Sequence, residues 1–140
     1  MPVLTLTDNP DPRLEQVLDA GLAEYNATQT GVRDGRALAV AVNDPDTGAP
    51  VGGLVGRTTL GLFFLDLFYL PEHLRHSGVG SRALRMAEEE AIRRGCRAGA
   101  LITMNIQAPE FYARHGWEEF GRVASMPGVE RVFMRKTLAG

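Results

Sequence analysis

The segment Arg75-His76-Ser77-Gly78-Val79-Gly80-Ser81 decides the fold, because it joins an apolar run to the strongest helical pattern in the chain. The first turn of a helix carries unpaired backbone N–H groups and the positive end of the helix dipole, which together attract anions. Glycines at positions 78 and 80 remove the Cβ atoms that would keep a phosphate away from those groups. The segment therefore predicts an anion site, and we expect the anion to be a phosphate ester.

Two other interpretations of this segment have to be weighed. Gly78 and Gly80 match part of a dinucleotide-binding motif, but that motif requires a short turn after the strand and an acid after the next strand. Here the connector over residues 71–77 is long, and the following strand ends in Met104-Asn105 without an acid. A glycine-rich helix start with no ligand stays open when this segment is considered alone.

Working outward, hydrophobic spacing and turn residues predict an α+β fold. A helix is expected over residues 78–94, with a buried face of Val79, Ala83, Met86, Ala87 and Ala91. Glu88, Glu89 and Glu90 are expected on its solvated face. Shorter helices are expected from Pro12, with Asp11 as N-cap, and from Pro109 to Gly116. Residues 26–34 are expected to form a loop.

The strands predicted by alternation and by apolar runs form one mixed, mostly antiparallel sheet. They cover residues 3–6, 37–42, 51–56, 63–70, 98–104, 117–123 and 132–137. Gly52 and Gly53 suggest a bulge or a close backbone approach within the second hairpin strand. We expect an αβα-layered fold with six to seven strands, helices on both faces, and a single domain over residues 1–140.

Composition excludes several classes of protein. The chain has 140 residues, of which 44% are hydrophobic and 23% charged, and its formal net charge is -2. This balance gives no reason to expect binding to nucleic acid or to a membrane surface. Cys96 is the only cysteine, no metal-ligand spacing is present, and no secretion signal is evident, so we expect a cytoplasmic protein without a metal.

A second segment, Asn105-Ile106-Gln107-Ala108-Pro109-Glu110-Phe111-Tyr112-Ala113-Arg114-His115-Gly116-Trp117, gives the first one a meaning. Together the two segments resemble the GNAT superfamily of N-acetyltransferases. The loop at 75–81 matches the superfamily pattern R/Q-x-x-G-x-G/A. The later segment matches N-x-x-A-x-x-x-Y-x-x-x-G-F/Y, with Trp117 as the final aromatic residue. The resemblance covers roughly Val51 to Leu138.

The resemblance implies acetyl-CoA as cosubstrate and assigns a role to each part of the site. The pantetheine arm would lie along a strand end and in a gap beside the next parallel strand, with Asn105 on the other side of the arm and Tyr112 near the sulfur. The residues of that strand end are Phe68, Tyr69 and Leu70. The pyrophosphate would be bound by the backbone at Arg75, His76, Ser77, Gly78, Val79, Gly80 and Ser81. His76 and Ser77 are less usual fillers of this loop and leave its backbone role intact.

The chemistry of acyl transfer to an amine suggests which residues act. The departing thiolate needs a proton, for which Tyr112 is the candidate, and a backbone N–H near Phe68 would stabilise the carbonyl oxygen. Asp66, the only charge in its apolar strand, is either a general base, an anchor for a cationic acceptor, or an exposed or hydrogen-bonded strand residue. Cys96 is expected to be a buried filler, so we expect direct transfer without a covalent intermediate. His73, His76 and His115 are expected at the surface.

The expected function is therefore transfer of an acetyl group from acetyl-CoA to a primary amine of a small molecule. A protein N-terminus or lysine as acceptor, or a coenzyme-binding module without catalysis, are the alternatives. Residues 14–34 and 125–131 are expected to form the acceptor pocket, and no residue pattern in them specifies the amine. A homodimer is a further expectation that no sequence feature demonstrates.

Overall fold

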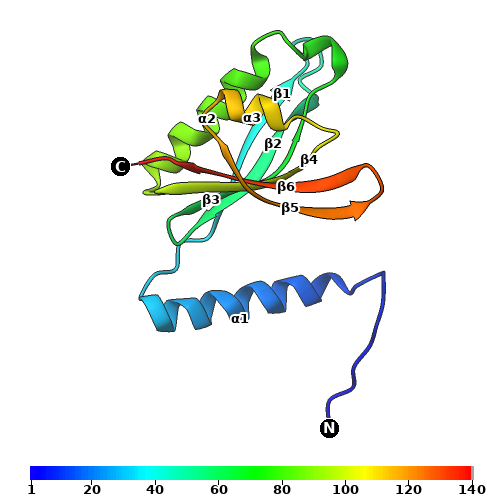
Figure 1. Cartoon of the computed structure of the whole chain (residues 1–140). Helices are drawn as coiled ribbons and strands as arrows, with labels where there is room; N and C mark the ends of the chain where they lie inside the picture. The colour runs from blue at the N-terminus through cyan, green and yellow to red at the C-terminus, as the bar shows by residue number, and fades with distance from the viewer. Residues whose placement is uncertain (140) are drawn as a thin grey trace. The chain divides into compact units, whose positions relative to one another are not determined.

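The computed structural model describes residues 1–139 (Figure 1). The chain divides into two compact units, Met1–Arg33 and Asp34–Gly140, which we describe separately. The sequence-based expectation of one domain over the whole chain stays a prediction.

The first unit contains one helix, α1 (Pro12–Thr30). It begins as expected: Pro12 is the first helical residue, and the Asp11 carboxylate accepts a hydrogen bond from the Arg13 N–H. The loop predicted from residue 26 onward is wrong as far as Thr30, because the helix continues until Gly31 ends it in a left-handed conformation with φ 75°. The Thr30 hydroxyl donates to the Asn26 carbonyl at 2.7 Å, so a polar side chain is satisfied inside the helix.

The predicted strand over residues 3–6 is also wrong. These residues adopt no regular structure, and no strand pairs with them in the part of the chain that the structure describes. A strand is stabilised by pairing with a neighbour, so weak alternation over four residues does not suffice.

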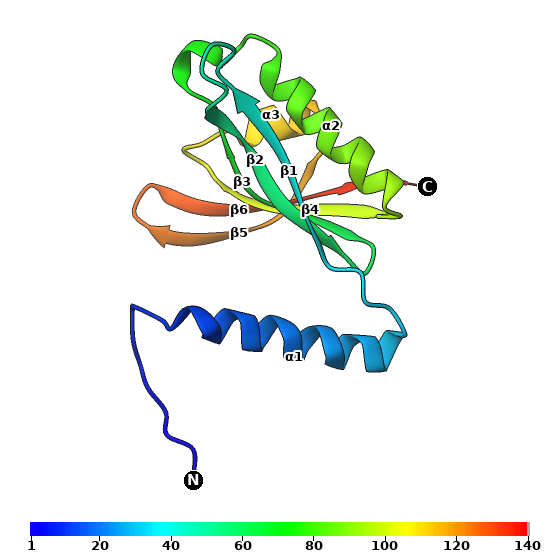
Figure 2. The same ribbon diagram turned by 180° about the vertical axis from the view of Figure 1, so that it is seen from behind.

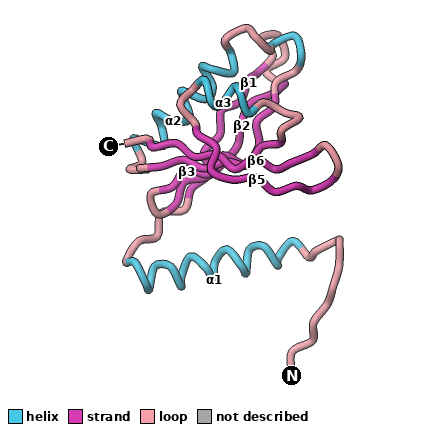
Figure 3. Tube along the Cα trace, in the orientation of Figure 1, coloured by secondary structure: helices cyan, strands magenta, loops and turns pink. Residues whose placement is uncertain are grey.

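The second unit is built on a six-stranded mixed sheet, as the sequence predicts (Figure 3). Its spatial order is β1-β2-β3-β4-β6-β5, and β3–β4 is the one parallel pair while the other pairs are antiparallel. The strands are β1 (Arg36–Asn43), β2 (Pro50–Thr59), β3 (Leu62–Tyr69), β4 (Ala98–Met104), β5 (Glu118–Met126) and β6 (Val129–Thr137). The parallel pair requires a crossover, and helix α2 (Val79–Arg93) supplies it.

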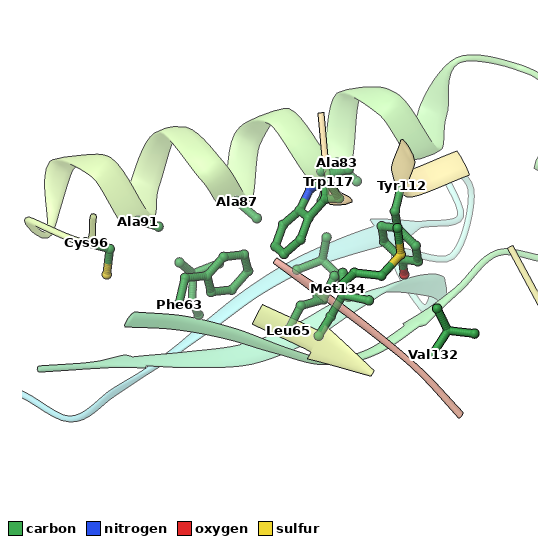
Figure 4. Close-up of a cluster of buried hydrophobic side chains, with 14 residues drawn as sticks. Phe63, Leu65, Ala83, Ala87, Ala91, Cys96, Tyr112, Trp117, Val132 and Met134 are labelled. Carbon is green, nitrogen blue, oxygen red and sulfur yellow. The ribbon is translucent and has the colours of Figure 1, made fainter. Parts of the chain in front are cut away.

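Helix α2 and the short helix α3 (Pro109–Arg114) lie on the same face of this sheet (Figure 1, Figure 2). They are the helices that the second unit contributes to the layered fold. A short 3₁₀ turn, η1 (Glu72–Leu74), interrupts the connector before α2. The buried cluster between helices and sheet contains Phe63 and Val132, each fully enclosed (Figure 4). Leu84 belongs to the same cluster and is also fully buried.

The buried face of α2 differs in part from the prediction. Ala83, Ala87 and Ala91 are buried as expected, but Met86 is 54% exposed and Leu84 takes its place in the core. The buried positions follow i, i+4 and i+7 spacing from Gly80, and Met86 lies well outside that stripe.

Glu88 contradicts the expected solvated face. Its side chain is buried, because its carboxylate has two partners in the protein: Oε2 accepts from the Trp117 Nε1–H at 3.2 Å and Oε1 pairs with the Lys136 ammonium.

The glycines at the start of β2 permit close backbone approach, as predicted. A Cβ on Gly52 would lie 2.7 Å from the Tyr69 carbonyl oxygen, and one on Gly53 would lie 2.2 Å from that of Val40. The β1–β2 register also shifts here, between Val42 and Asn43.

Candidate active site

The connector after β3 is fixed by Arg75. Its Nε–H donates to the Leu70 carbonyl at 2.9 Å, and its guanidinium lies 5.9 Å from the centre of the Tyr69 ring. Arg75, expected to help bind the phosphate, thus also holds the loop at residues 75–81 against the end of β3.

The start of α2 has the geometry that an anion site requires. Gly78 is the N-cap, with φ 88° and no side-chain hydrogen bond to the helix. Among residues 1–139, the one hydroxyl contact to a first-turn N–H is long, from the Val79 N–H to Ser77 Oγ at 3.4 Å. The first-turn N–H groups therefore remain available to a ligand.

Gly78 and Gly80 are needed for different reasons. A Cβ at Gly78 would meet nothing within 4 Å, so its positive φ is what favours glycine. A Cβ at Gly80 would approach Leu70 Cδ1 at 3.2 Å and the Phe111 ring at 3.5 Å. The missing Cβ of Gly80 thus lets the helix start pack against the protein, a role that the sequence analysis did not assign to it. The loop also contains a non-glycine residue with positive φ, His76 at 61°.

A gap separates the second halves of the parallel strands. Residues Leu62 to Leu65 of β3 pair with Ala98 to Leu101 of β4. β3 then continues to Tyr69 and β4 to Met104, but these second halves do not pair with each other. The gap implied by the family resemblance is present, and Phe68 and Tyr69 lie along its edge. Backbone groups here can bind an extended ligand as a strand would.

A β-bulge at Asp66 coincides with the start of this gap. In the β2–β3 ladder Gly56 pairs with Leu65 and Val55 pairs with Leu67, so Asp66 is the extra residue. A bulge bends the strand that carries it. The Asp66 carboxylate is exposed and has no hydrogen bond or ion pair within residues 1–139. Its role as base or anchor stays a prediction.

Tyr112 is held in an aromatic cluster beside the gap. Its ring makes edge contacts with Phe68, Phe111 and Trp117, with centroids 6.4, 5.3 and 6.3 Å away. Burial raises the pKa of Tyr112 to about 12, so the phenol is protonated at neutral pH. No partner binds the hydroxyl in the described chain, yet the hydroxyl is not sealed from solvent. It is a protonated donor without a partner among the described residues, and its catalytic role stays a prediction.

Asn105 joins the end of β4 to the β5–β6 hairpin. Its Nδ2–H donates to the Gly128 carbonyl at 3.2 Å, and its Oδ1 accepts from the Glu130 N–H at 2.8 Å. Both polar atoms of the Asn105 side chain are thus already hydrogen-bonded within the protein. A contact between Asn105 and the pantetheine arm stays a prediction.

An open cavity of about 500 Å³ lies at this hairpin. Its lining includes Asn105, Ser125, Met126 and Glu130. The Glu130 carboxylate lies 3.2 Å from the Arg122 guanidinium and gives the cavity one acidic group. The expected acceptor segment at 125–131 thus borders a cavity large enough for a small molecule.

Cys96 is a buried residue, 2% exposed, as the sequence predicts. Burial, and secondarily the nearby Asp34 carboxylate, raises the pKa of its thiol, so it is a poor nucleophile. Among the described residues no group of His, Cys, Asp or Glu could hold a metal ion. None of their helices is long and apolar enough to cross a membrane.

Sequence reasoning missed a set of polar contacts behind the site. The Ser81 hydroxyl lies 3.0 Å from His115 Nε2, and the Lys136 ammonium donates to the His115 carbonyl at 2.7 Å. Lys136 is the only lysine in the chain, which was the one signal in the sequence that could have drawn attention to it.

A glycine-capped helix start after a strand lies beside a gap between parallel strands. Comparison with known proteins shows the family to which a chain with this fold belongs. Residues 5–117 match the acetyltransferase (GNAT) family. The acetyltransferase Atu2258 of Agrobacterium fabrum is 35% identical over 121 residues, which cover 86% of this chain and 88% of that protein. Blasticidin-S acetyltransferase of Streptomyces morookaense is 32% identical over 120 residues, covering 83% and 88%.

A solved structure from Agrobacterium tumefaciens, titled a putative acetyltransferase, superposes with a TM-score of 0.85 at 32% identity, covering 96% of this chain and 98% of that one. The chain belongs to the GNAT acetyltransferase family and is an acyltransferase.

Proposed function

We propose that this acyltransferase moves an acetyl group from acetyl-CoA directly to a primary amine of a small molecule. The observation that carries the proposal is the gap between β3 and β4 next to the glycine-capped start of α2. Both lie at the carboxyl ends of the parallel strands, where ligands bind in open α/β sheets. A pantetheine arm in the gap would place its pyrophosphate at the helix start.

The residues present fit this cosubstrate. The helix start offers backbone N–H groups free of a capping side chain, which suit the pyrophosphate. The unpaired edge of β3 beyond Leu65 offers N–H and C=O groups to the amides of the arm. Arg75 holds the loop between these two parts.

The proposed reaction needs no enzyme-bound intermediate. The amine nitrogen attacks the thioester carbonyl carbon, a C–N bond forms, and the C–S bond breaks. Tyr112 donates its proton to the departing thiolate, and the amine loses its proton to Asp66 or to water. A backbone N–H at the β3 edge near Phe68 stabilises the carbonyl oxygen. Cys96, buried and with a raised thiol pKa, takes no part.

A small amine is the acceptor that the site supports best. The cavity of about 500 Å³ at the β5–β6 hairpin has the size of a small-molecule site, and the Glu130 carboxylate that lines it is paired with Arg122. Asn105, which lines the cavity, directly follows β4 and so lies at the edge of the gap. The relative named for blasticidin S supports an acceptor of this kind.

The test is thiol release from acetyl-CoA across a panel of acceptors. Blasticidin S, simple polyamines, a peptide with a free N-terminus and a lysine peptide with a blocked N-terminus should be compared. Release with a small amine but with neither peptide supports the proposal. Release with a peptide alone would make the protein a peptide acetyltransferase, and coenzyme binding without any release would make it a binding module.

A further inference from the structure

A chain of polar contacts connects the middle of α2 to the end of α3. The Glu88 carboxylate of α2 pairs with the Lys136 ammonium of β6, and the two side chains are only 12% and 25% exposed. The same ammonium donates to the His115 carbonyl at 2.7 Å. Trp117 donates to the other Glu88 oxygen at 3.2 Å. Every polar atom in this group has a partner, so the group fixes the backbone at the end of α3.

The side chain of His115 then reaches the first turn of α2. Its Nε2 lies 3.0 Å from Ser81 Oγ, and its ring lies 4.9 Å from the Phe111 ring. Ser81 and Glu88 are seven residues apart on α2 and therefore lie on one face, about 10 Å apart along the axis. His115 is thus held to the same face of α2 at two points, once by its backbone and once by its ring.

The number of protons available indicates which partner donates in the hydrogen bond between Ser81 and His115. A serine hydroxyl has one proton to donate, whereas a phosphate oxygen at neutral pH mainly accepts. If Ser81 gave its proton to His115, it would have none for a phosphate. If His115 Nε2–H donates to Ser81 Oγ, the hydroxyl proton is free to point to the phosphate. A phosphate at the start of α2 therefore selects the imidazole form that carries hydrogen on Nε2.

We propose that His115 is a positioning residue for the coenzyme: it donates from Nε2 to Ser81 Oγ and turns the Ser81 hydroxyl toward the pyrophosphate. This inference rests on the proposed function, since it requires a coenzyme phosphate at the helix start. The ion pair of Glu88 and Lys136 is the support that keeps the imidazole in place.

Coenzyme A binding, measured by titration calorimetry, tests the proposal on the full chain. His115→Ala should raise the dissociation constant about 3- to 10-fold, the effect of weakening one hydrogen bond to a charged group. His115→Gln, which keeps an N–H donor, should recover most of the loss. His73→Ala, at an exposed histidine outside the site, is the matched control. An unchanged dissociation constant for His115→Ala would overturn the proposal.

A double-mutant cycle separates positioning from a general structural role. In a Ser81→Ala background, His115→Ala should add little, because the hydroxyl that it orients is gone. Fully additive losses would refute the coupling. In kinetics, the loss of kcat/KM should appear as a higher KM for acetyl-CoA and should be confined to the phosphate-bearing donor. An equal loss with acetylpantetheine, which lacks the phosphates, would show a structural effect and overturn the proposal.

The same measurements distinguish this inference from the proposed function. Wild-type protein that does not bind coenzyme A would overturn both. Wild-type binding with an unchanged His115→Ala variant would overturn this inference alone.

Discussion

Replacing Tyr112 by phenylalanine separates its chemical role from its packing role. The ring contributes edge contacts to Phe68, Phe111 and Trp117, all of which a phenylalanine ring retains. The hydroxyl has no partner in the described chain. Its removal should therefore change the free energy of unfolding by less than about 1 kcal/mol. Loss of a general acid should lower kcat by about 100-fold or more.

The free energy of unfolding of the wild type and of Tyr112→Phe at alkaline pH provides a second test of the role of Tyr112. Burial raises the pKa of Tyr112 from 10.0 to about 12. Between these values the unfolded chain releases a proton that the folded chain keeps, so stability is intact below pH 10 and falls as the pH rises toward 12. Two pKa units correspond to about 2.7 kcal/mol. The wild type should lose up to this much more stability than Tyr112→Phe over that range.

The assays are steady-state thiol release, calorimetric coenzyme binding, and urea unfolding at several pH values. Tyr112→Ala is the packing control, and it should cost about 3–5 kcal/mol of stability because it removes a buried ring. Turnover by Tyr112→Phe at the wild-type rate would refute Tyr112 as the acid. An unchanged alkaline stability profile in Tyr112→Phe would refute the burial argument on its own.

Three further predictions concern the helix start, the packing of Gly99 against Trp117, and the buried polar group. Gly80→Asp should abolish acetyl-CoA binding in calorimetry, because its side chain would force a negative charge against Leu70 and Phe111 and distort the helix start. The smaller Gly80→Ala, whose Cβ would meet Leu70 Cδ1 at 3.2 Å, should weaken binding much less. Gly99→Ala should destabilise the protein by about 1–3 kcal/mol in urea unfolding, since the new Cβ would lie 2.6 Å from the Trp117 ring. Glu88→Ala leaves the Lys136 ammonium without its anion and should cost about 3 kcal/mol, of which Lys136→Met should restore part in the double variant. The restoration is partial because the Trp117 Nε1–H and the His115 carbonyl would still lack their partners. Normal coenzyme binding by Gly80→Asp would contradict the argument about the helix start. Normal stability of Gly99→Ala would contradict the packing argument. A double variant no more stable than Glu88→Ala would contradict the argument about the buried ion pair.

The elements with a local signal were predictable from the sequence. Pro12 and Asp11 marked the start of α1 correctly, and β4 was predicted with its observed bounds, Ala98–Met104. The predicted strand over residues 3–6 failed because its existence depends on a pairing partner, which local alternation does not report.

Glu88 shows why the buried polar group was missed. It stands in a run of three glutamates, which by itself is typical of a solvated helix face. It also follows Leu84 by four residues, so it lies on the buried side of α2. The partner that makes its burial tolerable, Lys136, is 48 residues away in the sequence. A charge can be buried when it is paired, and pairing at such a separation is a property of the fold.

The bulge in β3 leaves its mark in the burial pattern, which the sequence alone does not reveal because Leu67 is as apolar as Phe68. Phe63 and Leu65 are buried on one face, and the next core-facing residue is Phe68 rather than residue 67. A break of this kind in a two-residue period is what an extra residue produces. The charge at Asp66 occupies the extra position, which explains how an aspartate is tolerated in an otherwise apolar strand.

The bulge and the gap are therefore best understood as one feature. The extra residue at Asp66 bends β3 directly after Leu65, and Leu65 is also the last residue of β3 that pairs with β4. A straight β3 would continue its ladder with β4 and leave no edge for a pantetheine arm. The bulge places Asp66, whose side chain is exposed, at the start of the gap. A structural role in the bulge and a chemical role in proton transfer are compatible for this residue, since the same geometry supports both.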